Sequence, residues 1–206
     1  SSYSTGQIIN AGRGLVGVTN NSTVTNSYWD IETSGIETTS GGTGLTTAQM
    51  RSISSFAGWD IGNTGGTGTI WRIYEGQTAP LLRHFMTPLT VTANNAPSKT
   101  YDGTAYSGGN GVTWSGFKPG EDVTYLDGAL AYGGSAQGAV NAGTYTIMPS
   151  GYYSGQQGYD IITVSGSLTV TPRDITITAD TASRIYGNTN PTFTYTVGGD
   201  GLVNGD

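Results

Sequence analysis

The string Thr87-Pro-Leu-Thr-Val-Thr-Ala93 opens a unit of sequence that closes near Pro172. Just beyond it, Ile175-Thr-Ile-Thr-Ala179 repeats the last five positions of that string at an offset of 86 residues. Apolar residues that alternate with threonine are typical of strands with one buried face, and a repeat of this length indicates consecutive domains. We therefore expect one β module over residues 87–172 and the start of a second over residues 173–206.

The composition favours small all-β domains. Of the 206 residues 34 are glycine and only 11% are charged, which excludes a helical protein and favours strands joined by many turns. The hydrophobic content of 35% predicts thin cores. The net charge of −6, with eight scattered lysine and arginine residues, argues against nucleic acid as a partner. Without cysteine the chain forms neither disulfides nor thiolate metal sites, and it has no apolar run of membrane-spanning length.

The central module contains several short stretches of strand-like sequence between turn residues such as Tyr101-Asp-Gly103. The expected strands cover residues 89–93, 111–117, 123–130, 138–140, 143–149, 159–164 and 166–171. Closely spaced strands favour an antiparallel β-sandwich or a β-grasp-like sheet. Alternation along the strands places Tyr145, Ile147, Leu168 and Val170 on the inward face.

Residues 1–44 show a second, shorter period. Ser2-Tyr3 is repeated by Ser27-Tyr28 at a spacing of 25 residues. Short strands separated by glycine and asparagine at a fixed period are typical of β-solenoid coils, in which apolar residues stack inward. The expected stacked residues are Ile8, Leu15, Val16 and Val24. An ordinary β-meander would use the same residues, so both interpretations remain open.

Residues 45–86 are expected to cap the open end of the solenoid. Thr46 and Gln49 have the spacing of a helix capping box, which predicts a helix of about ten residues that ends at Gly58. Its apolar face would carry Leu45, Met50, Ile53 and Phe56. Two short strands are expected after it, over residues 59–61 and 70–74. Such a short helix needs an apolar surface to pack on, and an uncapped solenoid end would expose one.

Several of these residues resemble known bacterial families. Gly14-Leu-Val-Gly17 with Asn26-Ser-Tyr-Trp-Asp30 resembles the GLUG motif of large secreted adhesins of the filamentous-haemagglutinin type. Lys99-Thr-Tyr-Asp-Gly-Thr104 with Asn141-Ala-Gly-Thr-Tyr145 resembles the YDG domain of surface exoproteins. Arg184-Ile-Tyr-Gly-Asn188 resembles the opening of the related MBG domain.

The resemblance implies a division of the chain into four parts. Residues 1–44 would be GLUG-type coils at the end of a parallel β-helix, residues 45–86 a capping segment with one short helix, residues 87–172 a YDG-like antiparallel module, and residues 173–206 a truncated MBG-like module. The chain is thus expected to be all-β apart from the cap, and to be an excised part of a longer protein.

Aromatic residues are the candidates for ligand binding, because flat rings stack on the apolar faces of sugars. The candidate carbohydrate-binding residues are Trp59, Trp71, Trp114, Tyr152 and Tyr153. Such binding requires at least two exposed and coplanar rings. Packing in a core is the alternative role for the same side chains.

Other reactive side chains are expected to be structural. Asp200, Asn204 and Asp206 offer oxygen atoms that suit calcium, but their spacing matches no complete calcium-binding loop. The acidic residues at positions 102, 121, 122 and 127 lie in turns, and His84 has no catalytic partners near it in sequence. Lys99 is the candidate for a covalent lysine–asparagine staple. We expect no catalytic residue and no cofactor.

The resemblance implies a structural and adhesive segment of a secreted or cell-surface bacterial adhesin, associated with the outer membrane and active in cell adhesion or biofilm formation. Its partner would be a glycan or protein receptor on a host cell or matrix, bound in part by other regions of the parent chain. We expect a monomer that neither binds nucleic acid nor inserts into a membrane. The alternative function is a carbohydrate-binding module that recognises polysaccharide through exposed aromatic residues.

Overall fold

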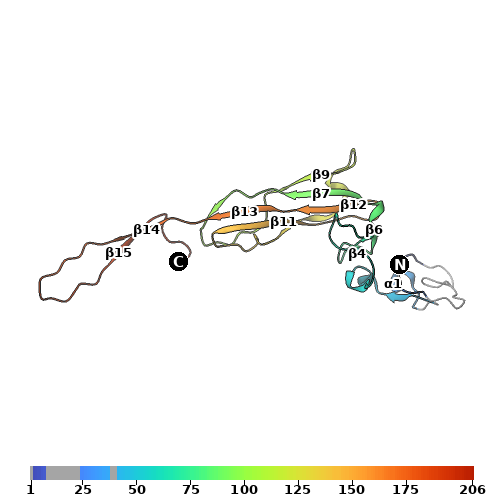
Figure 1. The fold of residues 1–206 in the computed structure, drawn as a ribbon, viewed down its shortest axis with the longest axis horizontal. Helices are drawn as coiled ribbons and strands as arrows, with labels where there is room; N and C mark the ends of the chain where they lie inside the picture. Colours follow the sequence, from blue (N-terminus) through green and yellow to red (C-terminus); the bar gives the residue numbers. More distant parts are fainter. Residues whose placement is uncertain (1, 8–23, 38–40) are drawn as a thin grey trace. The chain divides into compact units, whose positions relative to one another are not determined.

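The computed structural model describes residues 2–7, 24–37 and 41–206, and this part of the chain consists mostly of β-strands with two short α-helices (Figure 1). The all-β class expected from composition is confirmed. The chain divides into two compact units. The first comprises residues 1–91, 114–130 and 151–163, and the second comprises residues 92–113, 131–150 and 164–206.

Three parallel strands form a small sheet near the N-terminus: β1 (Ser2–Ser4), β2 (Ser27–Asp30) and β3 (Thr43–Leu45). Tyr3 pairs with Tyr28, the register that the 25-residue spacing predicts. Parallel pairing of successive short strands suits a solenoid, and the β-helix itself stays a prediction. Of its expected core, Val24 is half-buried, whereas Ile8, Leu15, Val16 and the Gly14–Gly17 motif lie outside the described residues.

The first helix, α1 (Ile31–Ser34), begins at Asp30, whose carboxylate accepts hydrogen bonds from the amides of Glu32 and Thr33. The second helix, α2 (Thr47–Met50), has the predicted capping box, with both the Thr46 and Gln49 bonds present. Its expected length was wrong, because it ends at Met50.

The early end of α2 has a local cause. Ser52 has extended backbone angles, and a new 3₁₀ helix, η1 (Ile53–Ser55), begins after it. The Glu75 carboxylate accepts hydrogen bonds from the Ile53 amide and the Ser52 hydroxyl. A carboxylate at the free amides of a helix start stabilises that start, so residue 75 selects two short helices over one longer helix.

The predicted apolar residues of this segment do pack together. Met50 and Phe56 are each 1% exposed, and Ile73 is fully buried. The cluster consists of Leu45, Met50, Phe56, Trp59 and Ile73, with Tyr3, Tyr28, Ile53, Ile61 and Trp71 packed against it. Side chains from the parallel sheet and from residues 45–73 therefore share one core.

Three two-residue strands follow: β4 (Ile61–Gly62), β5 (Trp71–Arg72) and β6 (Leu81–Leu82). β5 lies between the others, parallel to β4 and antiparallel to β6. The 3₁₀ helix η2 (Arg83–Phe85) then leads into the repeat region.

The first repeat copy forms two sheets. One has the order β12-β7-β9, and the other has the order β10-β11-β13-β8. Their strands are β7 (Thr87–Ala93), β8 (Lys99–Thr100), β9 (Val112–Ser115), β10 (Asp127–Gly133), β11 (Gly143–Tyr153), β12 (Tyr159–Val164) and β13 (Gly166–Thr171). β11 and β13 are antiparallel, but β13 and β8 are parallel. The module is thus mixed, and a sandwich arrangement remains a prediction.

Two expected strands of this copy were wrong in part. The stretch 123–130 begins with the 3₁₀ helix η3 (Val123–Tyr125), because Asp122 caps it by accepting a hydrogen bond from the Thr124 amide. The stretch 138–140 is a turn, in which Gly138 has a φ of 83°. The Gly138 amide donates a hydrogen bond to the Tyr106 carbonyl, and the Ala139 carbonyl accepts one from the Tyr106 amide.

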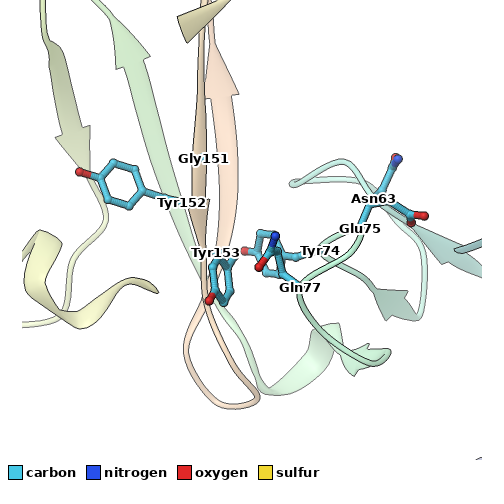
Figure 2. Close-up of a pocket in the computed structure, with 7 residues that line it drawn as sticks. All are labelled: Asn63, Tyr74, Glu75, Gln77, Gly151, Tyr152 and Tyr153. Carbon is cyan, nitrogen blue, oxygen red and sulfur yellow. The ribbon is translucent and has the colours of Figure 1, made fainter. Parts of the chain in front are cut away.

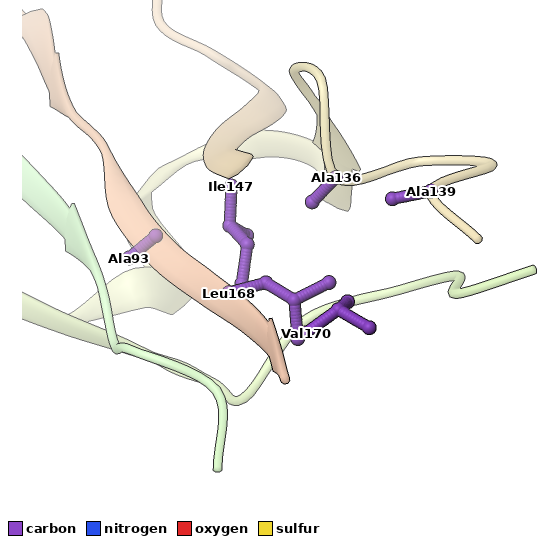
Figure 3. Close-up of a cluster of buried hydrophobic side chains, with 6 residues drawn as sticks. All are labelled: Ala93, Ala136, Ala139, Ile147, Leu168 and Val170. Atoms are coloured by element: carbon purple, nitrogen blue, oxygen red, sulfur yellow. The ribbon is translucent and has the colours of Figure 1, made fainter. Parts of the chain in front are cut away.

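The core of the second unit is small. Ile147 and Leu168 are fully buried and Val170 is 2% exposed, which confirms the inward face predicted for them. Alanines from the loop after β10 approach these side chains from the other side (Figure 3). The cluster consists of Ala93, Ala136, Ala139, Ile147, Leu168 and Val170, with Tyr145 among the residues packed around it.

The second repeat copy has a single antiparallel pair, β14 (Ile175–Ala179) with β15 (Tyr195–Gly199). Its apolar residues are exposed, Ile175 to 46% and Ile177 to 65%. The equivalent residues of the first copy, Leu89 and Val91, are 0% and 2% exposed. The same alternating pattern thus has a buried face in one copy and a bare face in the other.

Candidate functional site

Two of the candidate carbohydrate-binding residues lie in a core. Trp59 is 8% exposed, and its indole nitrogen donates a hydrogen bond of 3.0 Å to the Asn26 carbonyl. Trp71 is half-buried, with its ring 4.8 Å from that of Trp59 and tilted by 40°. Tyr3 packs on the edge of Trp71 at 5.8 Å. These rings fill space between short strands and present no flat exposed pair.

Tyr152 and Tyr153 are neighbours on β11, and their rings therefore point to opposite sides of the strand. Tyr152 packs against Trp114 at 5.4 Å with an angle of 69° between the rings. Tyr153 packs against Tyr74 at 6.4 Å. Figure 2 shows the Tyr153 ring beside Tyr74 and Gln77, with the Tyr152 ring pointing away from them. The two adjacent tyrosines belong to two different surfaces of the first unit.

A cleft of about 260 Å³ lies on the Tyr153 side (Figure 2). Its lining residues are Asn63, Tyr74, Glu75, Gln77, Gly151, Tyr152 and Tyr153. The Glu75 carboxylate is already bonded to Ser52 and Ile53. The half-buried Tyr153 ring and the two side-chain amides therefore supply the chemistry of this cleft, a combination that fits a polar ligand with one apolar face.

The other surface carries a row of aromatic rings. Trp114 contacts Tyr152 on one side and Phe117 on the other, each at 5.4 Å. Phe117 in turn meets Tyr159 at 5.3 Å and 82°. Because each ring is strongly tilted against the next, the row has no coplanar pair on which a sugar would stack.

A buried ion network contacts Tyr74, which is one of the residues that line the cleft. Asp160, 4% exposed, lies 3.2 Å from Arg72 Nε and 2.5 Å from Arg83 Nη1, and it accepts a hydrogen bond from the Gly66 amide. The Arg72 guanidinium stacks over the Tyr74 ring at 4.0 Å. The Tyr74 hydroxyl donates to the Tyr159 carbonyl and accepts from the Ile161 amide.

Burial shifts the acid–base behaviour of two members of this network. It raises the pKa of the Tyr74 hydroxyl and lowers the pKa of Arg72, whose positive charge Tyr74 and Asp160 partly support. Sequence reasoning missed the network. The available signal was Asp160 inside the apolar strand Tyr159-Asp-Ile-Ile162, where a charge needs a buried partner.

Two of the three side chains proposed for calcium, those of Asn204 and Asp206, bond to another part of the second unit. The Asn204 side-chain amide donates to the Gly103 carbonyl at 2.7 Å, and Asp206 accepts a hydrogen bond from the Tyr101 hydroxyl at 2.8 Å. The Asp200 backbone carbonyl accepts a bond from Arg173. Within the described ranges, no three histidine or acidic side chains are grouped closely enough for a metal ion.

The remaining candidates lie in local structure. His84 packs against the Phe85 ring at 5.5 Å. Lys99 Nζ bonds to the Asp102 carboxylate at 2.5 Å and to the Thr104 carbonyl at 2.6 Å. The bond from Lys99, with those from Thr104, holds the pKa of Asp102 well below its ordinary value. The helices that the structure describes are all too short or too polar to cross a membrane.

Comparison with known proteins identifies the repeat. The family model of the MBG domain (YGX type) matches residues 89–169 and, separately, residues 175–206. The matches begin at Leu89 and Ile175, which are the positions related by the 86-residue offset. No curated protein and no solved structure matches the chain significantly. Because the two matches together cover more than half of the sequence, the chain belongs to the MBG domain family of the YGX type.

Proposed function

We propose that this chain is a structural and adhesive segment of a secreted or cell-surface bacterial adhesin. The observation that carries the proposal is the tandem arrangement of two MBG copies after a small parallel sheet. The MBG family is a structural one, of extracellular β-rich domains. On this proposal the parallel strands are the last coils of a β-helix, residues 45–86 cap it, and the MBG copies begin a stalk.

The mechanism of such a segment is mechanical. The cap core of Met50, Phe56 and Ile73 covers apolar surface that an open solenoid end would leave bare. Pro172 stands between the two MBG copies, where a proline removes one backbone donor and limits bending. The stalk would hold a binding region away from the cell, with a host or matrix receptor as its partner.

Single-molecule stretching tests the structural part of this proposal. Because the chain has no cysteine, one cysteine added at each end gives a defined pulling geometry. A load-bearing first MBG copy should unfold in a discrete force peak, whose contour length matches the residues of the first match. Smooth extension without that peak would overturn the stalk role.

The cleft beside Tyr153 favours a second candidate function, carbohydrate binding. A glycan array should then show saturable binding that is lost in Tyr153→Ala and Gln77→Ala. Trp114→Ala and Phe117→Ala are the matched controls, because they alter aromatic rings that do not line the cleft. Flat signals on the array, or equal losses in the controls, would exclude a glycan site in this cleft.

A further inference from the structure

The Tyr101-Asp102-Gly103 turn of the first MBG copy holds the end of the second copy. Both partners belong to the second compact unit. Tyr101 donates its hydroxyl proton to Asp206 at 2.8 Å, and the Gly103 carbonyl accepts a hydrogen bond from the Asn204 amide at 2.7 Å. A hydroxyl donor and a carbonyl acceptor thus face a carboxylate and an amide donor, which is a complementary pairing of all four groups.

The two surfaces also fit closely in shape. Gly103 has a φ of 70°, and a methyl group there would lie 2.5 Å from the Asn204 Cβ. Only glycine allows this approach without a clash. On the other side of the same loop, Arg173 Nε donates to the Gly201 carbonyl at 2.7 Å. The loop 200–206 is therefore held from both ends.

The turn is also held by hydrogen bonds within its own copy. Asp102 accepts hydrogen bonds from the Thr104 amide and hydroxyl as well as from Lys99. These bonds point the Asp102 side chain into its own copy and leave the Tyr101 hydroxyl and the Gly103 carbonyl for a partner. A preorganised surface loses less conformational freedom on binding.

The bound loop has a counterpart in the first copy of the internal repeat. Gly201-Leu-Val-Asn-Gly-Asp206 corresponds to Gly116-Phe-Lys-Pro-Gly-Glu121 in the first copy, and both end in an acid after glycine. Glu121 also accepts a hydrogen bond from a tyrosine, but from Tyr159 of its own copy. The acid of this loop thus accepts a hydrogen bond from a tyrosine in both copies, although Tyr159 and Tyr101 occupy different positions of the repeat.

We propose that the Tyr101-Asp102-Gly103 turn is a docking site by which one MBG copy holds the Gly-x-x-Asn-Gly-Asp loop of the next, so that tandem copies form a stiff joint. The equivalent turn of the second copy, Tyr186-Gly187-Asn188, offers a similar site to the loop of another MBG copy, with glycine at the Asp102 position and Asn188 at the Gly103 position. Tyr186 is fully exposed, Gly187 has a φ of 91°, and open space surrounds Gly187. The proposal builds on the proposed stalk role, but it concerns the joint alone.

Spin labels measure the stiffness of the joint directly. The cysteine-free chain takes two labels, at Thr144→Cys in the first copy and Thr178→Cys in the second, both exposed strand positions. The unmodified joint should give one narrow distance distribution by pulsed electron resonance. Gly103→Ala should abolish the narrow peak because the added methyl group displaces Asn204.

Gly187→Ala is the matched control, since it carries the same positive-φ strain and meets no neighbouring atom. It should keep the narrow peak. If Gly103→Ala alters the fold of the first copy, Asn204→Ala with Tyr101→Phe removes the contacts and leaves the turn intact. If the distance distribution stays narrow in this double variant, the proposed joint is wrong. It is also wrong if the distribution is already broad in the unmodified chain. Neither result depends on whether the chain adheres to anything.

The exposed turn is tested with the free peptide Gly-Leu-Val-Asn-Gly-Asp at millimolar concentration. Amide signals of Tyr186, Gly187 and Asn188 should shift in a saturable way, and Tyr186→Phe, which removes the hydroxyl donor, should weaken the shifts. The absence of shifts at these residues would overturn the assignment of this turn as a second docking site.

Discussion

Arg72 and Asp160 lie 3.2 Å apart, Nε to Oδ1, and each side chain is only 5% exposed. The two atoms make an ion pair without the geometry of a hydrogen bond. Arg83 binds the other carboxylate oxygen at 2.5 Å. Asp160 lies inside the first MBG match, and both arginines lie before it. The network therefore ties the segment that precedes the family domain to strand β12 within the first unit.

Asp160→Asn should destabilise the first unit by about 3–5 kcal/mol, because it leaves two arginines without their buried counter-charge. All four tryptophans of the sequence fall in that unit, so their fluorescence during urea unfolding reports on it alone. Asp127→Asn, at the exposed start of strand β10, is the matched control. A loss below about 1 kcal/mol would class the network with surface ion pairs.

The Lys99–Asp102 pair predicts that the stability of the Tyr101-Asp102-Gly103 turn depends on pH. The folded pKa of Asp102 lies below the ordinary value of 3.8, chiefly through the bond from Lys99. A depressed pKa stabilises the fold above the unfolded value, and this stabilisation is lost as the pH falls through the folded pKa. The turn should therefore be fully stable above about pH 4 and weaken below it.

Carboxyl carbon signals measured by NMR across the acidic range test this directly. Lys99→Met should move the midpoint of Asp102 upward, toward the ordinary value of 3.8. An unchanged midpoint in this variant would show that Lys99 is not the main cause of the shift.

Gly65 approaches strand β12 so closely that a methyl group on it would lie 1.9 Å from the Ile161 carbonyl oxygen. Gly65→Ala must push the loop away from the strand, at a cost of about 1–3 kcal/mol. Gly68→Ala, in the same loop with open space around it, should leave the stability of the first unit unchanged or slightly higher. Equal urea midpoints for the two variants would contradict the close approach.

Local and periodic features were predictable from the sequence, and long-range ones were not. The Tyr3–Tyr28 register follows from a spacing, and the Thr46–Gln49 capping box from a three-residue pattern. The end of α2 depends on Glu75, 22 residues after the amide that it binds. No local pattern carries that information.

The prediction of the candidate site from the sequence had the same limit. Adjacent Tyr152 and Tyr153 were both candidates for carbohydrate binding, but strand alternation separates their rings. That separation was available from the sequence once the strand was extended to residue 153, and the expected strand ended at residue 149. The partners of the two rings, Trp114 and Tyr74, come from distant segments and required the structure.

The β14–β15 pair tests the expectation of a monomer. Neither strand carries a charged residue, and Ile175, Ile177 and Tyr195 are all at least 46% exposed. An uncharged edge with a bare apolar face favours pairing with a second copy of the chain. We expect the mass measured by light scattering to rise with concentration, and Ile177→Lys to suppress the rise. Thr178→Lys is the control, because it adds the same charge to the threonine face of the strand. Equal suppression by the two variants would assign the contact to the strand edge. A constant monomer mass would refute the association.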